Sequence, residues 1–252
     1  QFLCCGSSYI ACYASVSRLE DEQKYGIIWY ENFCQSPHDT STTLYMNTLQ
    51  SLRFNNRFAQ LPTDFYASVN PSPLSKPYLI SYSPTAAALL DLDPKIFQDS
   101  QTINLFAGNT TLPGMQPLAM LYAGHQFGHY VPQLGDGRAL LLGEVCTDQQ
   151  QHWEWHLKGA GETPFSRHAD GRAVLRSSIR EYLASEAMAG LGIPTTRALC
   201  LVGSNQRVYR EQLESAATVL RMAPSFVRFG NFEVFYHRQQ FQHLNTLADY
   251  II

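Results

Sequence analysis

The sequence has little that points to a membrane, to nucleic acid or to a disulfide framework. Its 18 Lys and Arg residues face 21 Asp and Glu residues, a net charge of −3, so the chain lacks the overall basic field that nucleic-acid binding needs. No apolar run reaches the roughly 18 residues that predict a membrane-spanning helix. We therefore expect a cytoplasmic protein with neither nucleic acid nor a membrane as partner.

Cysteine is scarce beyond the first 34 residues. Four of the six cysteines lie at positions 4, 5, 12 and 34, which leaves Cys146 and Cys200 for the rest of the chain. A disulfide framework would spread its pairs across the fold, and no two cysteines have zinc-ribbon spacing. The two later cysteines are expected to be free thiols in a reducing compartment.

Residues 1–45 also lack sustained periodicity of either helix or strand. This stretch is rich in Ser, Cys and Tyr, and Met46 opens a segment of different character. We interpret residues 1–45 as a poorly structured extension. Our hypothesis is that it is upstream sequence read through in frame, with Met46 as the natural start.

From residue 46 onward, hydrophobic periodicity and turn residues predict an α+β chain. Helices are expected over residues 49–58, 84–92, 117–124, 173–190 and 233–252. Strands are expected over residues 65–69, 78–82, 139–145, 153–158, 197–202, 207–211 and 218–223. An Asp-Gly pair predicts a hairpin turn at 135–138, and Gly203 begins a turn at 203–205. Leu175, Ile179, Leu183 and Ala187 recur every four residues and predict the buried stripe of the 173–190 helix.

The strand over 153–158 alternates cleanly between apolar and polar residues. Trp153, Trp155 and Leu157 fall on one face, and Glu154, His156 and Lys158 fall on the other. Lys158 therefore leaves the strand on its polar side, where a ligand could bind.

Two Gly-rich loops flank this lysine strand. Glycines such as Gly135 and Gly137 let backbone amides approach phosphate oxygens, and Lys158 supplies a mobile cation. A hairpin, a strand with Lys and a helix with Glu (here Glu181) follow one another as in a protein-kinase small lobe. The alternative is a solvated Lys158–Glu181 pair that contributes little. The two loops favour a nucleotide site.

Arg221 and Arg228 each lie inside an apolar, aromatic stretch. A buried or cleft-lining arginine needs an anionic partner, which is either a structural carboxylate or the phosphates of a nucleotide. The histidine pairs 125/129 and 152/156 share a four-residue spacing. Neither pair has the Glu of the H-E-x-x-H zinc motif, so we expect packing and hydrogen-bonding roles for them.

Several longer motifs resemble the selenoprotein O family. They are PLA (117–119), YAGHQFG (122–128), QLGDGR (133–138), LGE (142–144), WHLKGAG (155–161), DGRAVLR (170–176), GIPTTRA (192–198), RMAPS (221–225) and RFG (228–230). The resemblance covers roughly residues 46–252. On it, we divide the chain into a family N-terminal segment over 46–116, a nucleotide-binding lobe over 117–230 and the start of a further helix or lobe over 231–252.

The resemblance implies a kinase-like fold that transfers AMP from ATP to Ser, Thr or Tyr hydroxyls of proteins, with Mg²⁺ or Mn²⁺ in the complete enzyme. The positions that match the family's ATP-binding residues are Gly135, Gly137, Arg138, Lys158, Asp170, Gly171, Arg221 and Arg228, and Glu181 matches the supporting glutamate. A conventional kinase and a non-catalytic ATP-binding module are the alternatives.

The family's catalytic aspartate, its neighbouring asparagine and its metal-binding aspartate have no match in this sequence. We therefore expect a lobe truncated before the catalytic lobe, with no catalytic or metal-binding residue in the chain and no AMP transfer by the chain alone.

Overall fold

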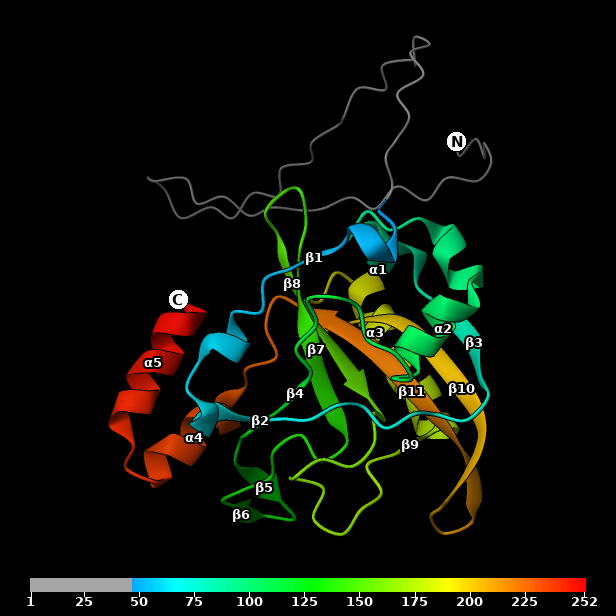
Figure 1. Ribbon diagram of the computed structural model, residues 1–252. Helices are drawn as coiled ribbons and strands as arrows, with labels where there is room; N and C mark the ends of the chain where they lie inside the picture. Colours follow the sequence, from blue (N-terminus) through cyan, green and yellow to red (C-terminus); the bar gives the residue numbers. More distant parts are fainter. Residues whose placement is uncertain (1–46) are drawn as a thin grey trace, which may run out of the picture. The chain divides into compact units, whose positions relative to one another are not determined.

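The computed structural model describes residues 47–252, so the expectations for residues 1–45 lie outside the described residues (Figure 1). This part of the chain is a mixed α/β domain built on one large antiparallel sheet. The sheet runs in the order β2-β4-β7-β8-β11-β10-β3, with β1 added to β7 and β9 added to β11. A separate hairpin pairs β5 with β6.

The elements have the following bounds. The strands are β1 (Arg53–Phe54), β2 (Tyr66–Ser68), β3 (Pro77–Tyr82), β4 (Leu118–Met120), β5 (Gly124–Gln126), β6 (His129–Val131), β7 (Ala139–Cys146), β8 (His152–Lys158), β9 (Ala173–Val174), β10 (Arg197–Tyr209) and β11 (Leu213–Ala223). The α-helices are α1 (Pro84–Ala88), α2 (Ser100–Phe106), α3 (Leu175–Gly190), α4 (Phe229–His237) and α5 (Phe241–Ile251). Short 3₁₀ helices occupy Leu49–Ser51, Phe58–Gln60, Thr63–Phe65 and Pro94–Gln98.

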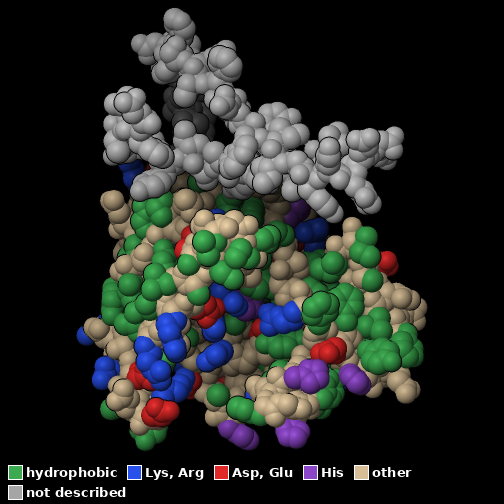
Figure 2. All heavy atoms as spheres, turned by 180° about the vertical axis from the view of Figure 1, so that it is seen from behind, with side chains coloured by type: hydrophobic (Ala, Val, Ile, Leu, Met, Phe, Trp, Pro, Cys, Tyr) green, Lys and Arg blue, Asp and Glu red, His purple; other side chains and the backbone are tan. Residues whose placement is uncertain are grey.

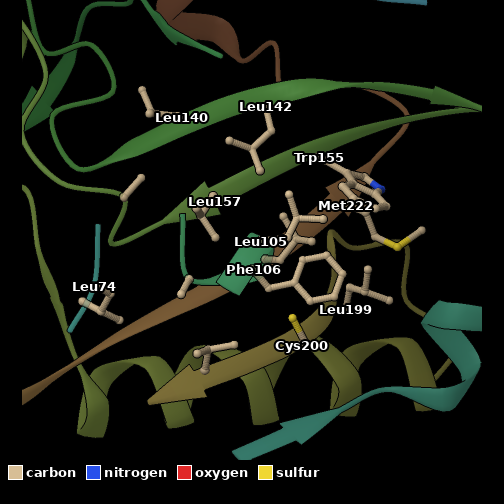
Figure 3. Close-up of a cluster of buried hydrophobic side chains, with 14 of the residues drawn as sticks. Leu74, Leu105, Phe106, Leu140, Leu142, Trp155, Leu157, Leu199, Cys200 and Met222 are labelled. Carbon is tan, nitrogen blue, oxygen red and sulfur yellow. The ribbon is translucent and has the colours of Figure 1, made fainter. Parts of the chain in front are cut away.

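The first face of the sheet carries the main hydrophobic core. Trp155 and Leu157 of β8 point into it together with side chains from β7, β10, β11 and α2 (Figure 3). Trp155 is fully buried and packs edge-on against Phe106 of α2, with ring centroids 5.8 Å apart. The predicted apolar face of strand 153–158 therefore faces this core, with Trp155 and Leu157 in it and Trp153 packed against it.

The second face of the sheet is covered by two separate groups of helices. Helix α3 packs on β10 and β11, where Leu175 and Tyr182 contact Leu201 and Val219. Helices α4 and α5 cover β4 and β7 through a second cluster that includes Phe235. In Figure 1 these two helices lie on the opposite side of the domain from β3 and β10.

Three of the predicted elements are wrong. Residues 117–124 contain β4 rather than a helix, because an apolar run this short also suits a strand that is buried on both faces, and all three residues of β4 are buried. Residues 135–138 do not join a hairpin, since β6 pairs with β5 while β7 pairs with β1, β4 and β8. Residues 203–205 lie within the continuous strand β10, whose register shifts between Gly203 and Arg207.

Two predicted helices are broken into shorter pieces. The 49–58 region forms 3₁₀ turns on either side of β1, because the backbone of Arg53 and Phe54 is extended and pairs with β7. The 233–252 tail is two helices, and Gln239 between them has a positive φ of 57° that a continuous helix does not allow. The 84–92 helix ends early, at Ala88.

Helix α3 begins at Leu175, two residues later than predicted, because Ala173 and Val174 pair with β11 as strand β9, and it buries a different face than predicted. Ile179 is 38% exposed and Leu183 is 60% exposed, whereas Ser178 and Ser185 are buried. The small serines let the helix approach the sheet closely, and Ser185 donates a hydrogen bond to the carbonyl of Thr196. The predicted apolar stripe is therefore wrong as a description of how this helix packs.

Candidate functional site

The candidate site lies on the second face of the sheet, between α3 and α4. Register pairs Lys158 with Val219 and His156 with Arg221, so Lys158, His156 and Arg221 share that face. A pocket of about 200 Å³ lies there. It is lined by Tyr122, Asp136, Gly137, Arg138, Ala139, His156, Lys158, Arg221 and Arg228. Figure 2, the view from behind, shows Lys and Arg side chains gathered in the lower half of the molecule.

Glu181 of α3 joins two of the basic residues. It accepts a hydrogen bond from Lys158 Nζ, and its Oε1 lies 3.0 Å from Arg221 Nη1 in an ion pair. About a fifth of each of these three side chains is exposed. Burial lowers the pKa of Lys158, and Glu181 opposes that shift. The predicted Lys158–Glu181 pair is therefore present, and it shares its carboxylate with an arginine from β11.

A buried histidine lies on the other side of Arg221. Arg221 Nη2 is 2.9 Å from His156 Nδ1, and His156 Nε2 is 3.3 Å from Asp136 Oδ2. The His156 ring is 1% exposed and stacks on Phe226 with centroids 4.4 Å apart. Burial lowers the pKa of His156, which Asp136 partly opposes and Arg221 reinforces. Burial and the Arg221 charge thus both favour the neutral imidazole.

Asp136 also reaches the second predicted arginine. Its Oδ1 is 3.6 Å from Arg228 Nη1, and its Oδ2 accepts a hydrogen bond from the backbone N–H of Met120 at 3.1 Å. Burial alone would raise the pKa of Asp136, but His156, Arg228 and that N–H outweigh it and lower the pKa. The Arg228 guanidinium stacks over the Tyr122 ring at 4.3 Å. Both arginines are thus held by protein groups, and the pocket contains four cations and two carboxylates once Glu181 is included.

Gly135 and Gly137 contact the second Gly-rich loop rather than open space. A Cβ on Gly137 would lie 2.8 Å from the carbonyl oxygen of Phe165, and one on Gly135 would overlap the Phe165 ring. Ser166 Oγ donates to the Gly137 carbonyl at 2.6 Å. Packing between the two loops is sufficient to require glycine here, so a role in phosphate approach stays a prediction.

Asp170 and Gly171 line a second pocket of about 520 Å³ that adjoins the first. The two pockets share Tyr122, Gly137 and Arg138. Asp170 is held by a bidentate pair with Arg210, at 2.7 and 2.8 Å, which lowers the pKa of its carboxyl group.

Gly171 has a φ of +64°, and a Cβ there would lie 1.9 Å from the Gly161 carbonyl oxygen. Any other residue at this position would push the two loops apart.

The eight positions predicted to bind ATP therefore line two adjoining pockets, and Glu181 contacts two of their side chains, Lys158 and Arg221. Gly135, Gly137, Arg138, Asp170 and Gly171 line the larger one, and Gly137, Arg138, Lys158, Arg221 and Arg228 line the smaller one. Asp136, His156, Tyr122 and Arg210 were not predicted as site residues. For His156 a signal existed, since strand alternation assigns it to the same face as Lys158.

Comparison with known proteins identifies the class of this domain. A family model described as "Protein adenylyltransferase SelO" matches residues 48–252. The chain belongs to the SelO family, and its similarity to nucleotidyltransferases agrees with a pocket rich in cations.

Curated relatives carry the name "Protein nucleotidyltransferase YdiU". The one from Thiobacillus denitrificans is 63% identical over 207 residues, and the one from Myxococcus xanthus is 58% identical over 207 residues. The relative from Azotobacter vinelandii is 56% identical over the same length. Each alignment covers 82% of this chain and 42% of the relative, so the chain spans less than half the length of these proteins.

Proposed function

We propose that residues 47–252 form the ATP-binding part of a protein adenylyltransferase, which transfers AMP from ATP to Ser, Thr or Tyr hydroxyls of proteins. One observation carries the proposal. Lys158, Arg221, Arg228 and Arg138 converge on one pocket from four different segments of the chain. Among residues 47–252, the carboxylates that pair with these cations are Asp136 and Glu181. An excess of fixed positive charge of this kind suits a polyphosphate.

The chemistry assigns this lobe a binding and polarising role. In AMP transfer a protein hydroxyl attacks the α-phosphorus, the bond from that phosphorus to the bridging oxygen breaks, and pyrophosphate leaves. Charge grows on the phosphate oxygens during this step, and fixed cations stabilise it. Lys158 and Arg221, which both contact Glu181, are the cations we assign to this role.

A kinase-like small lobe is the fold we propose for residues 117–230, between the family N-terminal segment (46–116) and the helices that begin the next part (231–252). Strand β8 with Lys158 is followed by helix α3 with Glu181, and the loop between β6 and β7 carries the Gly-rich motif. This order of parts supports the proposal.

The family implies a divalent cation, Mg²⁺ or Mn²⁺, which would offset phosphate charge when bound. The residues described here do not fit one by themselves. Among residues 47–252 no group of three or more His, Cys, Asp or Glu side chains is arranged to hold a metal, and both pocket carboxylates already pair with basic side chains.

The test is ATP affinity, measured by isothermal titration calorimetry on the full 252-residue chain. Lys158→Ala is expected to weaken ATP binding by roughly tenfold or more, since one charge-assisted contact is worth about 1.5–3 kcal/mol. Lys95→Ala is the matched control, because Lys95 is exposed on the Pro94–Gln98 turn. Equal affinities for the two variants would refute the proposal.

A conventional kinase is the second candidate, since the same order of Lys and Glu occurs there. In a protein extended to the length of the relatives, ATP labelled at the α-phosphate would label the target in AMP transfer, and ATP labelled at the γ-phosphate would do so in phosphoryl transfer. Labelling of the target by neither, with ATP still bound, would support a non-catalytic ATP-binding module.

A further inference from the structure

His156 is a buried titratable side chain that contacts Arg221 of the proposed ATP pocket. It lines that pocket but is only 1% exposed, so little of its surface is accessible to a ligand. Its two ring nitrogens instead contact two protein groups, Arg221 on β11 and Asp136 on the Gly-rich loop.

Arg221 decides which nitrogen carries the proton. A guanidinium only donates hydrogen bonds, so Nδ1 of His156, 2.9 Å from Arg221 Nη2, must be the acceptor. The single proton of the neutral ring then lies on Nε2 and points to Asp136 Oδ2, 3.3 Å away. The lowered pKa of His156 agrees with this neutral form.

The Arg221 guanidinium needs this support, because its other contacts leave it incompletely held. Glu181 Oε1 approaches Nη1 at 3.0 Å, the Phe226 ring lies 5.3 Å from the guanidinium carbon, and the buried Nε has no hydrogen-bond partner among the described residues. The direction of the Nη2 group is therefore set by His156.

We propose that His156 is a positioning residue: its Nδ1 accepts a hydrogen bond from Arg221 and directs that guanidinium toward the phosphates, while the contact of its Nε2 with Asp136 sets the tautomer that makes Nδ1 an acceptor. This inference rests on the proposed function, since it assumes that Arg221 binds ATP. Asp136 contacts Arg228 with one oxygen and His156 with the other. His156 lies on β8 beside Arg221 of β11, so the imidazole links the Asp136 carboxylate to the Arg221 guanidinium.

Two variants of similar polarity separate positioning from packing. In His156→Asn the amide oxygen can take the place of Nδ1 and accept from Arg221, while Asp136 loses its donor. In His156→Gln the amide group reaches the place of Nε2 and can donate to Asp136, while Arg221 loses its acceptor. His156→Phe keeps the stack on Phe226 and removes both hydrogen bonds.

The experiment measures ATP affinity by calorimetry and the unfolding temperature by circular dichroism for these variants of the full chain. His156→Gln and His156→Phe are expected to bind ATP roughly tenfold more weakly than wild type, and His156→Asn within about threefold of it. In the double variant with Arg221→Ala, the change His156→Phe is expected to cause no further loss, because its effect passes through Arg221.

Two results would overturn the inference: equal ATP affinities for the Asn and Gln variants, or losses from His156→Phe and Arg221→Ala that simply add. These outcomes are distinct from failure of the proposed function. If Lys158→Ala and Arg221→Ala both leave ATP affinity unchanged, the pocket does not bind ATP. If they weaken binding and the His156 variants do not, only the positioning role is lost.

Discussion

The two ends of strand β8 carry polar side chains on the same face of the sheet, but their surroundings are opposite. At one end, Lys158 is partly exposed beside a pocket with excess positive charge. Toward the other end, Glu154 is 0% exposed and is sealed beneath α5. Identical alternation in the sequence has therefore produced an open cationic site and a closed acidic one.

The sealed end is a pair of buried carboxylates on facing strands. Glu144 of β7 lies opposite Glu154 because the register shift between Leu141 and Gly143 turns Glu144 to that face. Glu144 pairs with Arg57 at 2.6 Å. Glu154 accepts hydrogen bonds from the Phe226 N–H at 2.5 Å and from Tyr250 Oη at 2.7 Å.

The difference shows what a covering element does to a polar residue. At the sealed end protein groups saturate the carboxylates, and burial raises the pKa of Glu154 to about 7, although its two hydrogen bonds oppose that shift. At the open end the cations outnumber their partners and are accessible to a ligand. Stability should therefore depend on the first end, and ligand affinity on the second.

The largest stability effect is expected for Glu154→Ala. The Phe226 N–H and the Tyr250 hydroxyl would lose their acceptor in a buried site, at about 1–3 kcal/mol for each unpaired group. Denaturant unfolding at about pH 5 should show a loss of about 4 kcal/mol. Glu211→Ala, at an exposed turn, is the control. A loss below about 1 kcal/mol would contradict the view that stability depends on the buried Glu154 end of β8 more than on the Lys158 end.

The pH dependence of stability is the next largest effect. Glu154 has an ordinary pKa of 4.5 when unfolded and about 7 when folded, so the folded state binds this proton more tightly. The resulting stabilisation is present below about pH 4.5 and is lost as pH rises through 7, by as much as about 3 kcal/mol.

His156, whose pKa is lowered, gives the opposite slope below its ordinary pKa of 6.5. The quantity to measure is therefore the unfolding free energy of wild type minus that of Glu154→Gln across this pH range. A difference that does not fall as pH rises would show that Glu154 titrates normally.

The smallest stability effect is expected at the open end. Lys158→Met removes one partner of Glu181, but Arg221 remains 3.0 Å from that carboxylate and the site is partly solvated. The free energy of unfolding should change by less than about 1 kcal/mol, while ATP affinity falls as for Lys158→Ala. A stability loss as large as that of Glu154→Ala would show that Lys158 is a structural residue, and that the two ends of β8 do not differ in their contribution to stability.

Particular residues show how far sequence reasoning reaches. Lys158 was assigned to the polar face of its strand by alternation alone, and the order of strand and helix predicted its contact with Glu181. Arg221 was expected to need an anionic partner, and Glu181 is one. The prediction that Leu183 belongs to a buried stripe was wrong, because helical periodicity does not say which face of a helix meets the sheet. Ser178 and Ser185 are buried there instead.

By itself the sequence determined the local geometry of this domain: which residues of β8 face the core, where glycines free the backbone, and the order of lysine strand and glutamate helix. These follow from interactions between residues close in the chain. Only the tertiary structure decided that Glu154 is sealed while Lys158 is open, and that His156 links Asp136 to Arg221. Those outcomes depend on α5, β11 and the Gly-rich loop, which lie far away in sequence and meet β8 only after folding.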